Sequence, residues 1–282
     1  MSLAEQLIKE AEKLKPMSPV VTKIVSMADD PNVNFEEIAN VIRYDPAVTA
    51  GLLRVCNSAY FSLPRKVETV IQAISLLGMD MVLNITLMKS AGANLKKKNK
   101  GYGLNEGELW KNAVASALVA KQTALRIGND NPSMIFTATL LKDIGKVILD
   151  RFVQDKFVEI NEIVSSSHLS FRKAEKQVLG IDHAELGGLI AEKWSFAPRM
   201  INIIKNHHLP VWEGENAQDI CIVYLSDVVC MITGVGGGAD ALSYEFHPEV
   251  MEVLGITSET LQEIIAGFGE NLAEVEQLVK VV

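Results

Sequence analysis

Apolar positions recur with the spacing of α-helices along nearly the whole chain. After Ser18-Pro19, for example, the apolar positions Val20, Val21, Ile24 and Val25 lie on one helical face. Residues that commonly cap helices precede such stripes at Ser18, Asn34, Asp45, Thr69, Asp80, Ser133, Ser170 and Asp182. The sustained alternation of apolar and polar residues that is typical of strands is not found. The pattern therefore predicts an all-α protein, a compact array of many short helices.

A lysine-rich stretch divides this pattern in two. Residues Lys96 to Lys100 are followed by Gly101 and Gly103, which indicates a solvated connector. We expect an N-terminal helical subdomain at 1–100 and a C-terminal subdomain at 101–282, which ends in two amphipathic helices at roughly 258–267 and 271–281. Because the connector is short and both halves carry apolar faces, we expect the halves to pack permanently on each other.

Composition narrows the class of protein without naming a function. The 282 residues are 48% hydrophobic and 22% charged, which is typical of a soluble globular protein. The net charge of −8 argues against a nucleic acid as partner. The longest apolar stretch, Ile220 to Thr233, contains Asp227 and is too short to cross a bilayer, so we expect no membrane partner and a cytoplasmic location.

The three cysteines point to no metal site of their own. Cys56, Cys221 and Cys230 lie far apart in apolar surroundings, and none belongs to a Cys-x-x-Cys pair. This pattern suits buried, reduced thiols.

One stretch carries the strongest hint of chemistry. From Thr139 to Asp150 the chain is rich in large aliphatic residues, and Lys142 and Asp143 interrupt it side by side on what we expect to be a helix that starts at Ser133. Burying an ionised pair is costly unless each charge finds a partner or a metal. Either this pair belongs to a functional site or its remnant, or the two side chains reach solvent by their stems.

The surrounding residues resemble a known superfamily. Leu140-Leu141-Lys142-Asp143-Ile144-Gly145-Lys146 is similar to the Leu-Leu-His-Asp-Ile-Gly-Lys signature of the HD superfamily of metal-dependent phosphohydrolases, with lysine in place of histidine. Further stretches resemble the HDOD family, the HD-related output domain of bacterial signalling proteins. They are Met17–Pro19, Asp45–Ala50, Leu52–Phe61, Lys66–Val70 and Leu76–Gly78. The resemblance runs from about Pro16 to about Trp212.

The resemblance implies a set of pocket residues. The HD superfamily holds one metal with an early histidine, the His-Asp pair and a distant aspartate, and some branches add histidines for a second metal. The corresponding residues of this chain are Asn112, Lys142, Asp143, His183, His207, His208 and Asp227. Asn112 and Lys142 replace two of the four ligands of the first metal, and an ammonium group has no acceptor with which to bind a cation. We therefore expect Lys142 to act as a counter-ion for Asp143 and Asp227, and no metal at that position.

The histidines also have a simpler interpretation. His183 follows the capping residue Asp182 at the start of a helix, and His207 and His208 end one, where a cation suits the helix dipole. If any metal binds, its ligands are expected among Asp143, His183, His207, His208 and Asp227; otherwise no cofactor is expected.

These points lead to two main functional hypotheses, and nucleic-acid binding through the lysine run from Lys96 to Lys100 is a weaker third. The first is a non-catalytic regulatory output module that acts through other signalling proteins in trans, or through a small ligand such as a nucleotide or cyclic dinucleotide in the degenerate pocket. The alternative is a metal-dependent phosphohydrolase such as a cyclic-dinucleotide phosphodiesterase. The replacement of two metal ligands by Asn112 and Lys142 favours the regulatory module and leaves open whether the protein is an enzyme.

Overall fold

The computed structural model describes residues 3–14, 17–28, 34–167, 169–208, 214–236, 238–239 and 246–281. In these ranges every regular element is a helix and there is no strand, as the sequence predicted. The helices are α1 (Leu3–Lys13), α2 (Pro19–Ala28), α3 (Phe35–Arg43), α4 (Pro46–Cys56), α5 (Val70–Leu77), α6 (Met79–Leu95), α7 (Glu108–Arg126), α8 (Pro132–Leu141), α9 (Ile144–Asp155), α10 (Phe157–Ser167), α11 (Phe171–Leu179), α12 (His183–Lys193), α13 (Pro198–Asn206), α14 (Ala217–Ile232), α15 (Glu249–Leu254) and α16 (Ser258–Val281).

Local capping chemistry explains where several helices begin. The Asn34 side chain accepts hydrogen bonds from the backbone N–H groups of Glu36 and Glu37, both at 3.0 Å. Thr69 and Asp182 each open a helix with a capping box, in which the side chain at the third helical position bonds back to the capping residue. Two predicted caps are wrong: α6 begins at Met79 directly after Gly78 rather than after Asp80, and α8 begins at Pro132 with Asn131, not Ser133, as its cap.

Two larger features also differ from the sequence prediction. The end of the chain folds as one helix, α16, rather than two; glycine weakens a helix without necessarily ending it, and Gly267 and Gly269 continue this one. The pair Lys142-Asp143 does not lie inside a helix. Lys142 is the C-terminal cap of α8 and Asp143 precedes α9, so the pair occupies the junction between two helices.

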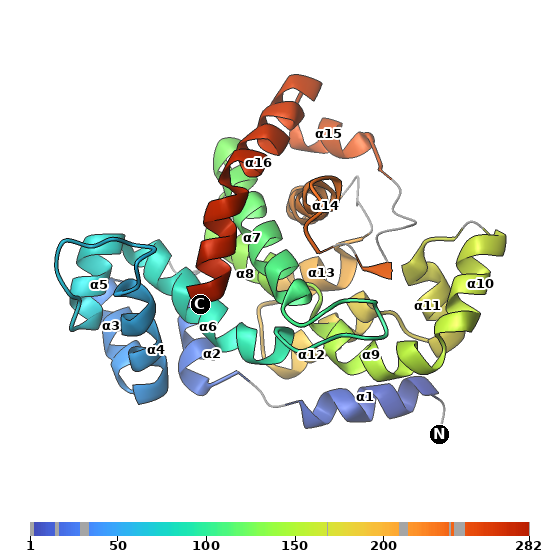
Figure 1. Ribbon diagram of the computed structural model, residues 1–282, viewed down its shortest axis with the longest axis horizontal. Coiled ribbons are helices and arrows are strands. Elements are labelled where there is room, and N and C mark those ends of the chain that lie inside the picture. The colour runs from blue at the N-terminus through green and yellow to red at the C-terminus, as the bar shows by residue number, and fades with distance from the viewer. Residues whose placement is uncertain are drawn as a thin grey trace.

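The two halves of the chain share one core. Buried apolar side chains form a continuous cluster that reaches from Leu7 in α1 to Leu278 in α16. Figure 1 shows α2 to α6 gathered on the left of the molecule, while α1 runs along the lower edge of the view beneath α9 and α12, with which it packs. Contacts of α6 with α7, α8 and α9 join the halves. The boundary at 100/101 stays a prediction.

The connector is more embedded than its lysines suggested. Lys97, Lys98 and Lys100 are exposed, but Tyr102 and Leu104 are buried. The Asp150 carboxylate of α9 accepts a hydrogen bond from the Gly101 N–H at 2.8 Å. A Cβ atom on Gly101 would lie 2.1 Å from the Asp150 carbonyl oxygen, so only glycine allows this approach. The connector therefore packs on α9 instead of standing free in solvent.

In the described part of the chain, no single helix is both long and apolar enough to cross a membrane, although α5 and α6 together pass the same test across a bend of 120°. Cys56, Cys221 and Cys230 are all buried free thiols, and burial raises the pKa of the Cys56 thiol to about 11.

Candidate functional site

The residues expected in the pocket come together although they lie on five different segments of the chain. Asn112 comes from α7, Lys142 and Asp143 from the α8–α9 junction, and Asp227 from α14. His183 is the first residue of α12, while His207 and His208 follow α13. Glycine permits this convergence, because a Cβ on Gly145 of α9 would lie 2.0 Å from the His183 carbonyl oxygen of α12.

One side of the pocket is the lysine cluster, which consists of Lys142 and its partners Asn112, Asp143 and Asp227. The Lys142 side chain is 1% exposed. Its ammonium group lies 3.0 Å from Asn112 Oδ1 and 2.9 Å from Asp227 Oδ1, and it also contacts Asp143 Oδ2. An ammonium group has three protons, so each proton has an acceptor.

The charges of this cluster hold one another ionised. Burial lowers the pKa of Lys142, but the carboxylates of Asp143 and Asp227 outweigh it and leave that pKa above its usual value. Burial raises the pKa of Asp143, and the ammonium groups of Lys142 and Lys146 reverse this and hold it well below its usual range. The Lys146 ammonium lies 2.8 Å from Asp143 Oδ1. Asp143 is therefore a carboxylate between two cations.

The segment at 234–236 closes this side. Asn112 Nδ2 donates to the Val235 carbonyl oxygen at 3.2 Å, and Val235 is buried. Gly236 has φ +71°, and a Cβ there would lie 2.4 Å from Asn112 Cβ. The segment at 234–236 thus packs directly on Asn112.

The other side of the pocket is the histidine cluster, His183, His207 and His208. One ligand atom from each, together with one from Asp143, lies within 4.8 Å of the others. The Nε2 atoms of His183 and His208 are 2.8 Å apart. Asp143 Oδ1 lies 3.7 Å from His183 Nε2 and 3.8 Å from His207 Nε2. Asp143 thus faces both clusters, one through each oxygen.

Neighbouring acceptors fix the orientation of two of these rings. His183 Nδ1 lies 2.8 Å from Glu175 Oε2, and His207 Nδ1 lies 2.8 Å from the Ile204 carbonyl oxygen. Since both partners accept hydrogen bonds, each Nδ1 carries a proton and each Nε2 turns toward Asp143. Among the described residues, His207 Nε2 is buried without a hydrogen-bond partner.

The protonation of the histidines follows their surroundings. Burial holds the pKa of His207 below its usual value, and burial together with the neighbouring imidazoles holds the pKa of His208 well below it. Burial also lowers the pKa of His183, but the Glu175 carboxylate outweighs it and raises that pKa.

Sequence reasoning missed two members of this network, Tyr102 and Glu175. Glu175 is fully buried on α11 and also accepts a hydrogen bond from the His183 backbone N–H at 2.8 Å. Its other oxygen accepts from the hydroxyl of Tyr102, a residue of the connector. The Lys146 ammonium lies 5.5 Å from the centre of the Tyr102 ring. A sequence signal existed for Glu175, because it shares the buried stripe of Phe171, Ala174 and Leu179.

The two clusters differ in their fit to a metal ion. The lysine cluster does not fit one, because the Lys142 ammonium occupies the centre of its donor atoms. The histidine cluster presents imidazole nitrogens and one carboxylate oxygen, a donor set that suits borderline divalent transition metals.

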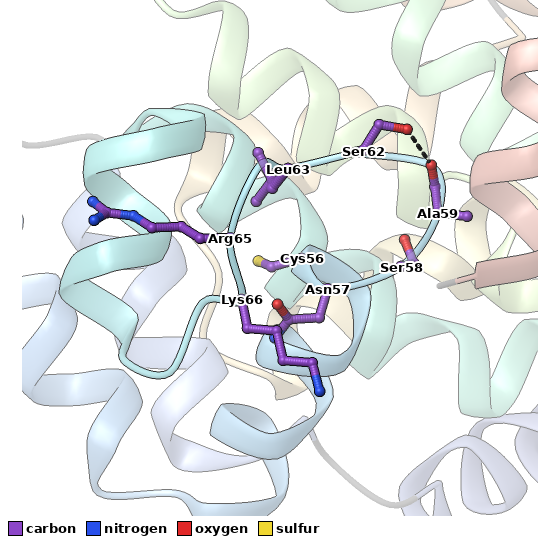
Figure 2. A pocket seen from close by; sticks show the side chains of 8 residues that line it. All are labelled: Cys56, Asn57, Ser58, Ala59, Ser62, Leu63, Arg65 and Lys66. Atoms are coloured by element: carbon purple, nitrogen blue, oxygen red, sulfur yellow. Dashed lines mark hydrogen bonds between the residues drawn. The ribbon is translucent and has the colours of Figure 1, made fainter.

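A separate hollow of about 220 Å³ lies in the loop between α4 and α5, lined by Cys56 to Ala59, Ser62, Leu63, Arg65 and Lys66. Asn57 closes the neck of this loop: its side chain accepts from the Val67 N–H at 2.8 Å and donates to the Val67 carbonyl at 2.7 Å. Figure 2 shows the side chains of Arg65 and Lys66 pointing in different directions, Arg65 away from the other lining residues and Lys66 past Asn57. The hollow therefore lacks converging charges, and we assign it no ligand.

Comparison with known proteins agrees with this architecture. A structure of an HDOD domain protein with unknown function from Geobacter sulfurreducens is 24% identical, covers 98% of each chain and has a TM-score of 0.74. A candidate signal transduction protein from Marinobacter aquaeolei is 20% identical, with a TM-score of 0.79, over 100% of this chain and 61% of that one. Because both identities are below 25%, these similarities establish a shared fold and nothing more about function.

A sequence relative and a family model complete the comparison. An uncharacterized protein from Treponema pallidum (strain Nichols) is 22% identical over 209 residues, which make up 73% of this chain and only 40% of the relative. The model of the HDOD domain matches residues 14–210, which confirms the resemblance first seen in the motifs. The chain belongs to the HDOD domain family.

Proposed function

We propose that this chain is a non-catalytic signalling module that regulates other proteins through contacts made in trans. The observation that carries the proposal is the Lys142 ammonium, which is buried among Asn112, Asp143 and Asp227. Hydrolysis by a metal pair requires two cations that can polarise the phosphoryl oxygen and supply hydroxide. An ammonium group supplies charge but has no open coordination position, so the lysine cluster keeps the pocket folded without Lewis-acid chemistry.

The comparisons support a signalling role at a coarse level. The chain belongs to the HDOD family, and the Marinobacter neighbour that is named as a candidate signal transduction protein contains this fold within a longer chain. We extend that role to this chain as a proposal and place its effect in a protein partner.

The histidine cluster favours a second candidate function, a one-metal phosphohydrolase. Asp143, His183, His207 and His208 would hold the ion. A bound ion would supply hydroxide at neutral pH. A Shewanella amazonensis neighbour with a TM-score of 0.71, named as a candidate phosphohydrolase, is 19% identical and shares the fold alone.

Turnover assays separate the two candidates. Purified protein is incubated with phosphomonoesters, phosphodiesters and cyclic dinucleotides in the presence of Mn²⁺, Ni²⁺ or Zn²⁺. We expect no hydrolysis above that of Asp143→Ala. Metal-dependent hydrolysis by the wild type that Asp143→Ala abolishes would overturn the non-catalytic proposal.

A further inference from the structure

We propose that the connector, the loop that joins α6 to α7 in Figure 1, is the surface on which an acidic segment of a partner protein binds. The binding surface is the basic patch, which consists of Lys96, Lys97, Lys98 and Lys100. This inference rests on the proposed signalling role, for which it names the place of contact and the charge of the partner.

Positive charge is concentrated in this part of an acidic chain. The net charge is −8, yet the stretch between Asp80 and Glu106 contains five lysines and no aspartate or glutamate. Four of these lysines form the basic patch, and the fifth, Lys89, lies on α6. Burial and the charge of Lys89 both hold the pKa of Lys96 below its usual value, so the two ammonium groups are close enough to repel each other. A concentrated positive field on an acidic molecule attracts a negatively charged partner and steers its approach.

Two ammonium groups of the patch are available to a partner. Lys97, Lys98 and Lys100 are exposed. Within the described part of the chain, neither Lys97 nor Lys98 forms a salt bridge. By contrast, the exposed Lys156 and Lys176 pair with nearby glutamates. The charges of Lys97 and Lys98 can therefore pair with carboxylates of another molecule.

The backbone under the patch is fixed. Asn99 and Leu104 exchange backbone hydrogen bonds of 3.1 and 2.9 Å, and the buried Asn99 side chain donates to the Lys97 carbonyl oxygen at 2.8 Å. Tyr102 anchors the same turn through the bond from its hydroxyl to Glu175. A surface that is already ordered loses less conformational entropy when a partner binds. The lysines thus extend from a rigid turn, although their own side chains are flexible.

The composition of the patch favours a protein partner over a nucleic acid or a membrane. The aromatic rings nearby, Tyr102 and Trp110, are 0% and 1% exposed, so they cannot stack on bases. No arginine, the residue that binds phosphate in a bidentate manner, lies between Asp80 and Glu106. No large hydrophobic residue is exposed in that stretch, all of which the structure describes, so it offers no apolar anchor for a bilayer. A short group of lysines on an acidic molecule suits a short run of carboxylates better than a long polyphosphate.

The experiment measures binding of the full chain to a labelled acidic peptide by fluorescence anisotropy at low ionic strength. The peptide alternates glutamate with serine. We expect wild-type protein to bind it, but not to bind the matched peptide in which glutamine replaces glutamate. The double variant Lys97→Glu and Lys98→Glu should bind about 10-fold more weakly or worse, because two attractions become two repulsions. Added salt should weaken binding by the wild type, since exposed charges are screened.

Two further double variants serve as controls. Lys23→Glu with Lys205→Glu makes the same change of charge at exposed positions of α2 and α13, and it should retain most of the affinity. Lys97→Arg with Lys98→Arg keeps both charges of the patch and should bind like the wild type. Circular dichroism checks that every variant is folded.

The fixed turn has a test of its own. Asn99→Ala removes the hydrogen bond to the Lys97 carbonyl oxygen without a change of charge. It should weaken peptide binding, though less than the charge reversal does. Wild-type affinity in Asn99→Ala would overturn the role of the ordered turn in binding.

Three comparisons separate an acidic protein segment from other occupants. Fluorescent single-stranded DNA and vesicles of phosphatidylcholine with phosphatidylserine are titrated under the same conditions, and gel filtration reports self-association. Tighter binding of DNA or vesicles than of the peptide would overturn the proposed partner, as would a dimer that Lys97→Glu with Lys98→Glu dissociates.

Failure of this inference and failure of the signalling role give different results. Equal affinity of the wild type and the charge-reversed variant for the peptide would overturn the basic patch as a binding surface and leave the signalling role intact. Metal-dependent hydrolysis in the turnover assays would overturn the signalling role, whatever the affinity for the peptide.

Discussion

The lysine cluster and the histidine cluster share Asp143 but place different groups against its two carboxylate oxygens. Lys142 gives one oxygen a built-in cation, and every proton of that cation has an acceptor. The other oxygen faces imidazole nitrogens, one of which has no hydrogen-bond partner among the described residues. The lysine cluster is thus complete in itself, whereas the histidine cluster leaves the buried His207 Nε2 without a hydrogen-bond partner among the described residues.

Removal of Lys142 should abolish this difference between the clusters and cause the largest loss of stability. Lys142→Met leaves Asp143 and Asp227 buried with less positive charge, and loss of one member of a buried pair costs about 3–5 kcal/mol. Urea unfolding measures the change. Lys156→Met is the control, since Lys156 and Glu159 form an exposed pair 2.9 Å apart and such pairs contribute at most about 1 kcal/mol. Equal losses in the two variants would show that Lys142 is no counter-ion.

Restoring imidazoles should make the two clusters alike. In the double variant Asn112→His and Lys142→His, the lysine cluster acquires neutral nitrogen ligands beside Asp143 and Asp227, and we expect this cluster to bind one metal ion. An ion present at 100 times its Kd stabilises the folded state by about 2.7 kcal/mol. Calorimetric stoichiometry and thermal unfolding with Ni²⁺ or Mn²⁺ measure both effects. A double variant that takes up no more metal than the wild type would contradict the assignment of Lys142 as the counter-ion that replaces a metal.

Loss of Asn112, the polar partner of Lys142, should reduce the free energy of unfolding less than loss of Lys142 itself. Asn112→Ala removes the acceptor 3.0 Å from the ammonium group, and hydrogen bonds to charged groups contribute about 1.5–3 kcal/mol. Asn105→Ala, which removes an exposed hydrogen bond of 3.2 Å to Glu108, is the matched control and should cost much less. Urea unfolding of both variants tests whether the third proton of Lys142 needs its acceptor.

The sequence revealed features that depend on local interactions or motifs, and it did not reveal those that depend on how distant helices pack. Helix starts such as Asn34, Thr69 and Asp182 were predictable because a cap is a local interaction within four residues. The members of the lysine cluster were named from motifs, and the structure places them in contact. The motif could not show that the pair Lys142-Asp143 lies between helices, since that depends on how α8 and α9 pack.

The residues that hold the histidine cluster in place, Tyr102 and Glu175, were not predicted, because their contacts join segments that are distant in sequence. Tyr102 lies beside the lysine run, whose charge suggested solvent, and only its packing beside α11 brings it to Glu175. Glu175 lies among charged neighbours, and its burial was visible only in its place on an apolar stripe. Residues that orient a site through a neighbour leave weaker sequence signals than residues that form it.

The smallest expected effect is a difference in how the two clusters respond to pH in metal-free protein. The pKa of Asp143 is depressed, so its contribution to stability is present above about pH 3.9 and is lost only as the pH falls further. The pKa of Lys142 is raised, so its contribution persists until the pH rises above about 10.4. The lysine cluster should therefore contribute constant stability from about pH 5 to 9.

The histidine cluster should instead make the free energy of unfolding pass through a maximum as the pH changes. The depressed pKa values of His207 and His208 mean that stability falls as the pH drops below about 6.5, because the unfolded chain then binds more protons. The raised pKa of His183 means that its contribution is full below about 6.5 and is lost as the pH rises above that value. The free energy of unfolding, measured with urea in chelator from pH 5 to 9, should therefore peak near 6.5. His183→Gln should remove the fall on the alkaline side, and His207→Gln should reduce the fall on the acid side. If neither variant changes the profile, these histidines do not titrate as their surroundings require, and the assignment of their protons in the pocket is wrong.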